Sequence, residues 1–235
     1  MILLLLAATA AAAAQPAPAA AGATVVCGRT MSYEDSVCAA IQAGKELRPA
    51  EAAEAYERAA QYAIGDAAKA RAQAAAGNMW IAAGKPGKAA LALDRALAGT
   101  GLQSEQRGEA LLDRARAAEA LNDLKSARAR VREAEQTISA DPFLWYFSAA
   151  LAIREGDPVT AKSAIGRALS LAPDDPTVLF EAGHVAIFTG DVASARTYWN
   201  RASQSDPQGA SGKAARDALS LLDAPPVQTP PPATK

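Results

Sequence analysis

Small and large apolar residues recur at fixed steps along the chain, with the period of an α-helix. Ala161, Ile165 and Ala168 follow one another at steps of four and three residues, so they lie on one face of a helix. Four other stretches repeat these steps. The columns are Ala52, Ala89, Ala127, Ala161 and Ala195; Tyr56, Leu93, Val131, Ile165 and Trp199; and Ala59, Ala96, Ala134, Ala168 and Ala202. The pattern predicts five helices with small and bulky side chains on the same face.

A turn and another helix precede each of these five helices. The turn residues are Leu47, Gly84, Asn122, Gly156 and Gly190, and small residues of the preceding helix form the column Ala40, Gly77, Ala115, Ala149 and Gly183. The resulting units are 33–66, 70–107, 108–141, 142–175 and 176–209, and the second ends in a lengthened loop. One helix pair cannot bury its whole apolar face, so the units are expected to stack on one another.

Prolines and aspartates mark where the second helices begin. Pro49, Pro86 and Pro158 occupy one column at the first helical turn, where a missing N–H costs nothing. Asp157 and Asp191 are placed to cap their helices. The local signals therefore agree with the periodicity.

These columns resemble the tetratricopeptide repeat family over residues 33–209, and the match is best in 142–175 and 176–209. The resemblance implies an all-α fold, an α-solenoid of about five helix-turn-helix repeats. Residues 210–224 are expected to form a C-terminal capping helix and 225–235 a disordered Pro-rich tail. Segment 33–66 departs from the family pattern, because Gly44 lies inside its first helix and Leu47 replaces the turn glycine.

The composition supports helices and argues against nucleic-acid binding. Half of the residues are apolar, many of them alanine, and only 5% are aromatic. Alanine is the residue that costs least to place in a helix. The chain has 24 Lys and Arg against 25 Asp and Glu, a net charge of -1, whereas nucleic-acid binders normally carry a basic face.

The N-terminus is typical of an exported protein. Residues 1–14 form an apolar run too short to span a bilayer and are interpreted as a signal peptide, with an uncleaved apolar tail as the alternative. Residues 15–32 then read as a linker. We expect a periplasmic or secreted protein without an integral membrane span after cleavage.

Two cysteines, Cys27 and Cys38, are compatible with an oxidising compartment. We expect a disulfide between them that ties the linker to the first helix; two unrelated thiols are the alternative. Metal binding is not expected, because two sulfur atoms and the distant His184 are too few ligands for a closed zinc site.

The resemblance implies that a protein or peptide partner binds in the groove lined by the first helix of each repeat. Aromatic and isoleucine residues gather at groove positions of the last two repeats, which suggests a recognition patch. The alternatives are that some of these side chains turn inward or that the end helix covers them. The candidate binding residues are Phe143, Tyr146, Ile153, Arg154, Phe180, His184, Ile187 and Phe188.

A carboxylate clamp of the kind some family members use is not expected. Ala74, Asp113 and Phe143 stand where the clamp needs polar or basic side chains.

The sequence contains few residues of the kinds that catalytic sites use. His184 is the only histidine, and no Gly-rich phosphate loop occurs. We therefore expect a non-enzymatic protein without a cofactor. Two functions fit: a periplasmic scaffold that binds a partner in its concave groove, or a self-associating structural or assembly factor of the cell envelope or secretion machinery, which would form homo-oligomers.

Overall fold

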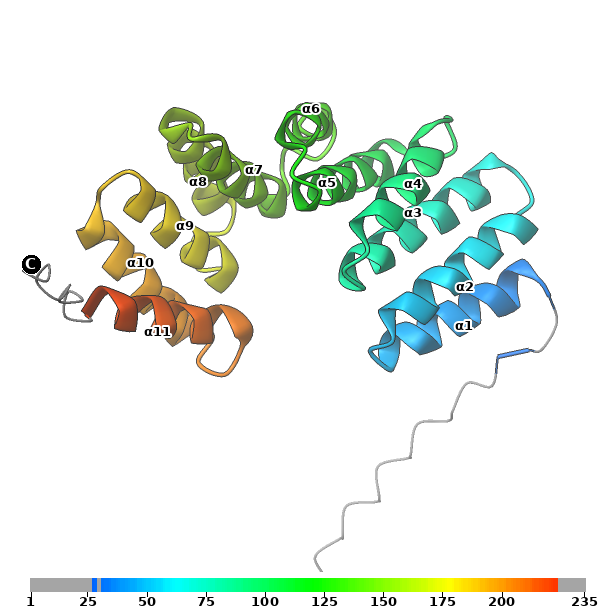
Figure 1. Ribbon diagram of the computed structural model, residues 1–235, viewed down its shortest axis with the longest axis horizontal. Coiled ribbons are helices and arrows are strands. Elements are labelled where there is room, and N and C mark those ends of the chain that lie inside the picture. Colours follow the sequence, from blue (N-terminus) through cyan, green and yellow to red (C-terminus); the bar gives the residue numbers. More distant parts are fainter. Residues whose placement is uncertain (1–26, 29–30, 224–235) are drawn as a thin grey trace, which may run out of the picture.

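The computed structural model describes residues 27–28 and 31–223, which form an arch of stacked helices with no strand (Figure 1). The predicted all-α solenoid is confirmed. The predicted signal peptide, most of the linker and the Pro-rich tail lie outside the described residues. The helices are α1 (Tyr33–Lys45), α2 (Pro49–Tyr62), α3 (Asp66–Ala82), α4 (Pro86–Leu97), α5 (Ser104–Ala120), α6 (Leu124–Ala134), α7 (Pro142–Glu155), α8 (Pro158–Leu171), α9 (Pro176–Phe188), α10 (Val192–Ser205) and α11 (Ala210–Asp223).

The first ten helices form five pairs, and α11 packs on α9 and α10 at the C-terminal end of the arch. Its Ala215 is fully buried, and Leu219 and Leu222 pack beside Leu179 and Trp199. Segment 33–66 forms a helix pair like the others, with Gly44 inside α1. None of the described helices is both long and apolar enough to cross a membrane.

The turn within each pair has the same backbone conformation in all five repeats. Its central residue has positive φ, and the next N–H bonds to the carbonyl five residues earlier, a closure that satisfies the end of the first helix. The φ angles are 56° at Leu47, 65° at Gly84, 61° at Asn122, 72° at Gly156 and 82° at Gly190. The bonds are Arg48 to Ala43, Lys85 to Trp80, Asp123 to Ala118 and Asp157 to Ala152, each 2.9 Å, and Asp191 to Ala186, 2.8 Å. The predicted alignment of the turns is therefore confirmed, including the two turns that lack glycine.

Aspartate caps begin five successive helices in the second half of the chain. Asp157 accepts hydrogen bonds from the N–H groups of Val159 and Thr160 at 3.1 and 3.0 Å, and from the Thr160 hydroxyl at 2.5 Å. The Thr160 hydroxyl bond, followed by the backbone bonds, lowers the pKa of Asp157 below its usual value. The other capping residues are Asp123, Asp141, Asp175 and Asp191.

Close packing joins the two helices of a pair where a small residue meets a large one. A Cβ added to Gly77 would lie 2.4 Å from Leu93 Cγ, and one added to Gly183 would lie 2.1 Å from Trp199 Nε1. All ten alanines of the two alanine columns have 0% exposure. The small–large–small helix face that the periodicity predicts is therefore the face that packs.

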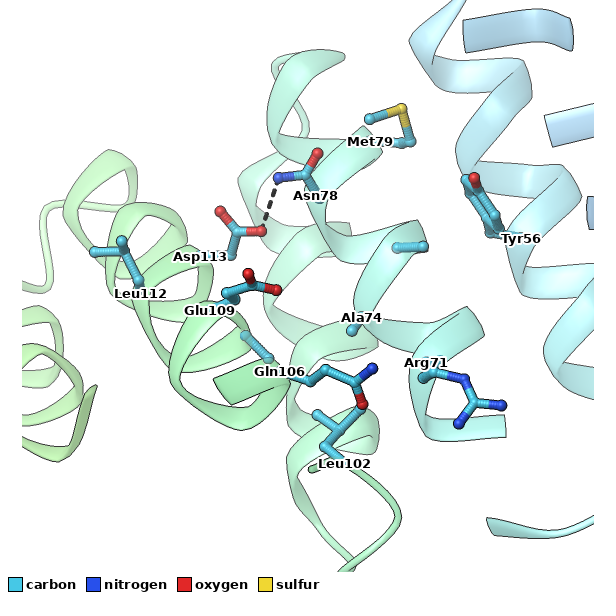
Figure 2. A pocket seen from close by; sticks show the side chains of 12 residues that line it. Tyr56, Arg71, Ala74, Asn78, Met79, Leu102, Gln106, Glu109, Leu112 and Asp113 are labelled. Atoms are coloured by element: carbon cyan, nitrogen blue, oxygen red, sulfur yellow. Dashed lines mark hydrogen bonds between the residues drawn. The ribbon is translucent and has the colours of Figure 1, made fainter. Parts of the chain in front are cut away.

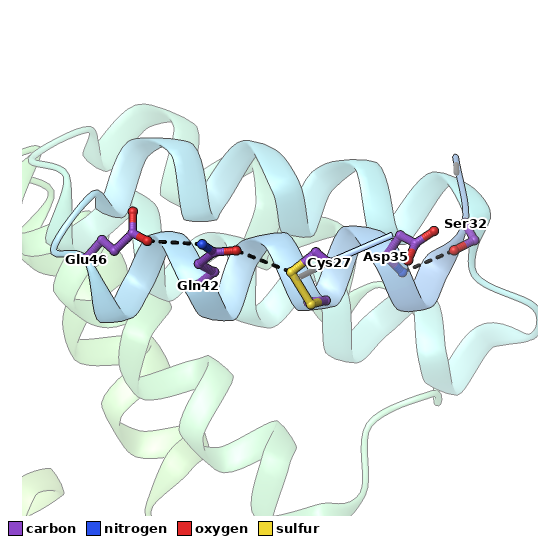
Figure 3. Close-up of a disulfide and its surroundings, with 6 residues drawn as sticks. Cys27, Ser32, Asp35, Gln42 and Glu46 are labelled. Atoms are coloured by element: carbon purple, nitrogen blue, oxygen red, sulfur yellow. Dashed lines mark hydrogen bonds between the residues drawn. A yellow bond between two sulfur atoms is a disulfide. The ribbon is translucent and has the colours of Figure 1, made fainter. Parts of the chain in front are cut away.

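The disulfide between Cys27 and Cys38 holds the start of the described chain against α1 (Figure 3). The two Cα atoms are 5.6 Å apart, and the side-chain oxygen of Gln42 lies 3.5 Å from Cys27 Sγ. Both cysteines of the chain are used in this bond. The predicted pairing is therefore present in the structure.

One core position of the second repeat holds a polar residue. Gln73 stands in the first-helix column that carries Leu111, Trp145 and Leu179 in later repeats, and it is only 7% exposed. Its Oε1 has no hydrogen-bond partner in the part of the chain that the structure describes. A buried polar atom without a partner costs free energy of folding.

We predict that Gln73→Leu raises the free energy of unfolding by about 1–2 kcal/mol, because it removes an unpaired buried oxygen and restores the apolar side chain of the other repeats. Chemical denaturation of the oxidised protein measures this change. Gln61→Leu on the exposed side of α2 is the control and should change stability by less than about 0.5 kcal/mol. A Gln73→Leu protein less stable than the parent would contradict the assignment.

Candidate functional site

The inner side of the arch is lined by the first helices α3, α5, α7 and α9, with α4, α6, α8 and α10 outside them (Figure 1). Within each of these pairs, the second helix packs against the first and occupies its outer flank. The first helices therefore present their remaining faces to the concave side, as the family resemblance implies.

A hollow of about 550 Å³ opens on this concave side between α3 and α5 (Figure 2). The small side chains of alanines on both helices leave room for the hollow, and longer side chains surround it. Its lining consists of Tyr56 from α2; Arg71, Ala74, Ala75, Asn78 and Met79 from α3; Leu102 from the loop before α5; and Gln106, Glu109, Ala110, Leu112 and Asp113 from α5. The hollow is thus apolar at its base and polar along its edges.

A hydrogen-bonded group spans the hollow from α3 to α5. Asn78 Nδ2 donates to Asp113 Oδ2 at 2.8 Å, and Arg116 Nη1 pairs with Asp113 Oδ1 at 2.9 Å. Asp113 orients the Asn78 amide so that its carbonyl oxygen, Oδ1, is left without a partner among the described residues. Arg71 and Glu109, from opposite walls, have no ion-pair partner within that same part of the chain.

The lengthened loop of the second repeat builds one end of the hollow. Gly101 passes so close to α3 that an added Cβ would lie 2.4 Å from the carbonyl oxygen of Asp66. Arg107 Nη1 holds the loop by donating to the carbonyls of Leu97 and Gly99, at 3.0 and 3.2 Å. Leu102 is thereby held in place with only 7% of its surface exposed, and it closes this end of the hollow.

The predicted recognition patch on α7 is partly exposed. Phe143 is 47% exposed and meets Tyr146 edge to face, with ring centroids 5.3 Å apart. Tyr146 and Ile153 pack against the core that the last three repeats share, and burial raises the pKa of the Tyr146 hydroxyl. Arg154 is bound within the chain, to Glu119 of α5 and to the turn residue Asn122.

The part of the patch on α9 is more deeply packed. Phe180 is half-buried and packs against the core that α9 forms with α10 and α11. Phe188 packs against the core of the preceding repeats, and Ile187 is 37% exposed. His184 contacts the Phe180 and Trp199 rings edge-on, with centroids 4.4 and 5.7 Å apart. Phe180 is half-buried, so its ring is partly turned inward, as one of the alternatives for this patch expects.

The sequence analysis did not select the residues that line this hollow, among them Arg71, Asn78 and Glu109. The available signal was the lengthened second repeat beside a first helix rich in alanine. The structure separates these residues, on α3 and α5, from the predicted patch on α7 and α9.

Residues 152–226, which include α8 to α11, match the family described as tetratricopeptide repeat. The C-terminal part of the chain therefore matches the tetratricopeptide repeat family. No curated protein sequence matches the chain.

Several solved structures share the solenoid. PilF of Pseudomonas aeruginosa superposes with a TM-score of 0.63 at 16% identity, covering 80% of this chain and 82% of its own. YrrB, described as a TPR protein with an unusual peptide-binding site, gives 0.57 at 17% identity, covering 81% and 93%. A thermophilic TPR protein in Thermus thermophilus gives 0.62 at 18% identity, covering 81% and 100%. At these identities the likeness is one of fold.

We predict opposite outcomes for two phenylalanines of the patch. Phe180→Ser should lower the free energy of unfolding by about 2 kcal/mol because it removes a ring from the α9–α11 core, whereas Phe143→Ser on the exposed start of α7 should change it by less than about 0.5 kcal/mol. Thermal and denaturant unfolding followed by circular dichroism measure both. Equal loss of stability in the two variants would show that Phe143 is also a core residue.

Proposed function

We propose that this tetratricopeptide repeat protein is a non-enzymatic scaffold that binds an extended peptide segment of a partner protein in the hollow between α3 and α5. The observation that carries the proposal is the hollow itself: a concave space of about 550 Å³ with an apolar base and a few oriented polar groups. Peptide and ligand sites commonly combine these features.

The lining suits a peptide backbone in particular. Asn78 Oδ1 is held by the Asp113 bond in position to accept a peptide N–H, and Ala74 and Ala110 let a main chain approach closely. Leu102 and Leu112 offer apolar surface for side chains of the segment. Free Arg71 and Glu109 would then select charged side chains at the rim.

A further observation supports a binding role. Chains of this fold include YrrB, whose description names a peptide-binding site.

We also propose that the protein acts in the periplasm or is secreted. The apolar run 1–14 and the Cys27–Cys38 disulfide support this location, because structural disulfides persist in oxidising compartments.

Filling the hollow should abolish binding. Peptides are selected from a random display library on the oxidised protein, and we expect Ala74→Trp to weaken their binding by at least about tenfold, because the indole would occupy the space of the peptide. Leu91→Trp at a 60% exposed position of α4 is the matched control and should bind like the parent.

Calorimetric titration of both variants with the selected peptides measures the effect, and circular dichroism checks the fold. Unchanged affinity in Ala74→Trp would contradict the hollow as the site. Loss of binding in Phe143→Ser alone would move the site to α7.

The location is tested by fractionating bacteria that express the full chain. We expect a periplasmic protein that lacks the leader and has no free thiol, and a cytoplasmic protein when residues 2–14 are deleted. The full-length mass in the cytosol of cells with the intact leader would contradict export.

A further inference from the structure

The junction between the third and fourth repeats is packed differently on its inner and outer sides. On the inner side α3 packs along α5, and α7 along α9, whereas α5 and α7 approach each other at far fewer points. On the outer side α6 packs on α7, and Val131 and Ile138 share a buried core with Leu144 and Trp145. Helix-on-helix packing across this junction is therefore mainly that of α6 on α7.

The segment that follows α6 packs on α5. Helix α6 ends after 11 residues at Ala134, and residues 135–141 continue as a loop whose Ile138 turns back onto α5. An added Cβ on Gly108 would lie 2.6 Å from Ile138 Cγ2, so the loop packs closely against α5. The chain between the two repeats is thus a loop packed on the outer side.

Two arginine–glutamate pairs bridge the junction at adjacent residues of the last turn of α7. Arg128 of α6 approaches from the outer side and contacts Glu155, with Nε 3.0 Å and Nη2 2.5 Å from Oε2; it also donates to Ser148 Oγ at 2.8 Å and to the Ser148 carbonyl at 3.1 Å. Ser148 is buried. These bonds anchor the outer side of the junction.

Arg154 bridges the inner side. Its guanidinium pairs with the Glu119 carboxylate, donates to the Glu119 carbonyl at 3.0 Å and donates to Asn122 Oδ1 at 2.8 Å. Its side chain is 40% exposed and that of Glu119 27%, against 12% and 23% for Arg128 and Glu155. Salt and competing charged groups therefore act on the inner pair more strongly than on the outer pair.

From this asymmetry we infer that the junction is a hinge. The α6–α7 packing and Arg128 form its pivot, and Arg154 is the latch that holds the inner side closed. Release of Arg154 from Glu119 lets the C-terminal repeats swing outward and widens the concave groove between α5 and α7. Leu112, which lines the hollow between α3 and α5, also packs against the core on the α7 side, so the same motion reshapes one wall of the proposed peptide site.

The use of the hinge in binding rests on the proposed function, but the motion is measured without any peptide. Donor and acceptor dyes are attached through Glu54→Cys on α2 and Asp217→Cys on α11, both exposed, with the native disulfide kept oxidised. Single-molecule energy transfer then reports the separation of the two ends of the arch.

We expect Arg154→Gln to lower the mean transfer efficiency and broaden its distribution. Arg114→Gln is the matched control: Arg114 Nε pairs with Asp94 Oδ1 at 2.8 Å between α5 and α4, across a junction where the helices also pack directly, and its loss should leave the efficiency unchanged. An unchanged distribution in Arg154→Gln, or an equal shift in Arg114→Gln, would overturn the hinge.

The wild-type chain gives a second readout that does not depend on any variant folding. Raising sodium chloride to about 1 M shortens the Debye length to about 3 Å, which should release the exposed inner pair and lower the transfer efficiency as Arg154→Gln does. No effect of salt on the wild-type chain would also overturn the inference. If no peptide binds but the separation of the two ends of the arch still depends on salt, the proposed function is rejected and the hinge is retained.

Discussion

Within a repeat, a small residue of the first helix packs directly against a large side chain of the second, and this contact sets the geometry of the solenoid. At Gly77 and Gly183 there is no room for a Cβ, because Leu93 Cγ and Trp199 Nε1 already lie within 2.4 Å of where it would be. The two helices of a repeat are therefore held at close range, and the fully buried alanines extend this contact along their length. The first helices are left with their other faces toward the inner side of the arch, which is where the hollow forms.

Departures from the repeat pattern shape the concave face of the arch. Leu102, in the loop that ends the second repeat, closes one end of the hollow between α3 and α5. In the third repeat α6 ends after 11 residues, and Arg128 and Arg154 bridge the next junction. The proposed binding hollow and the proposed hinge thus lie at consecutive junctions, on either side of α5.

The periodic features could be predicted from the sequence because each depends on residues close together in the chain. The left-handed turns at Leu47 and Asn122 were found by spacing alone, without the glycine that normally marks them. The hollow could not be predicted, because it depends on how the non-periodic loop folds back over the start of α3. Aromatic composition indicated Phe180 as a binding residue, but the half-burial of its ring depends on a core that α9 shares with α10 and α11, which follow later in the chain.

The most direct test of the account is to observe which side chains a bound peptide touches. In a two-dimensional NMR spectrum of the oxidised protein, addition of a selected peptide should shift the side-chain amide of Asn78 and the backbone amides of α3 and α5 around Ala74 and Ala110. The amides of α9 around Phe180 should stay in place. Shifts centred on α7 and α9, with Asn78 unaffected, would contradict the account.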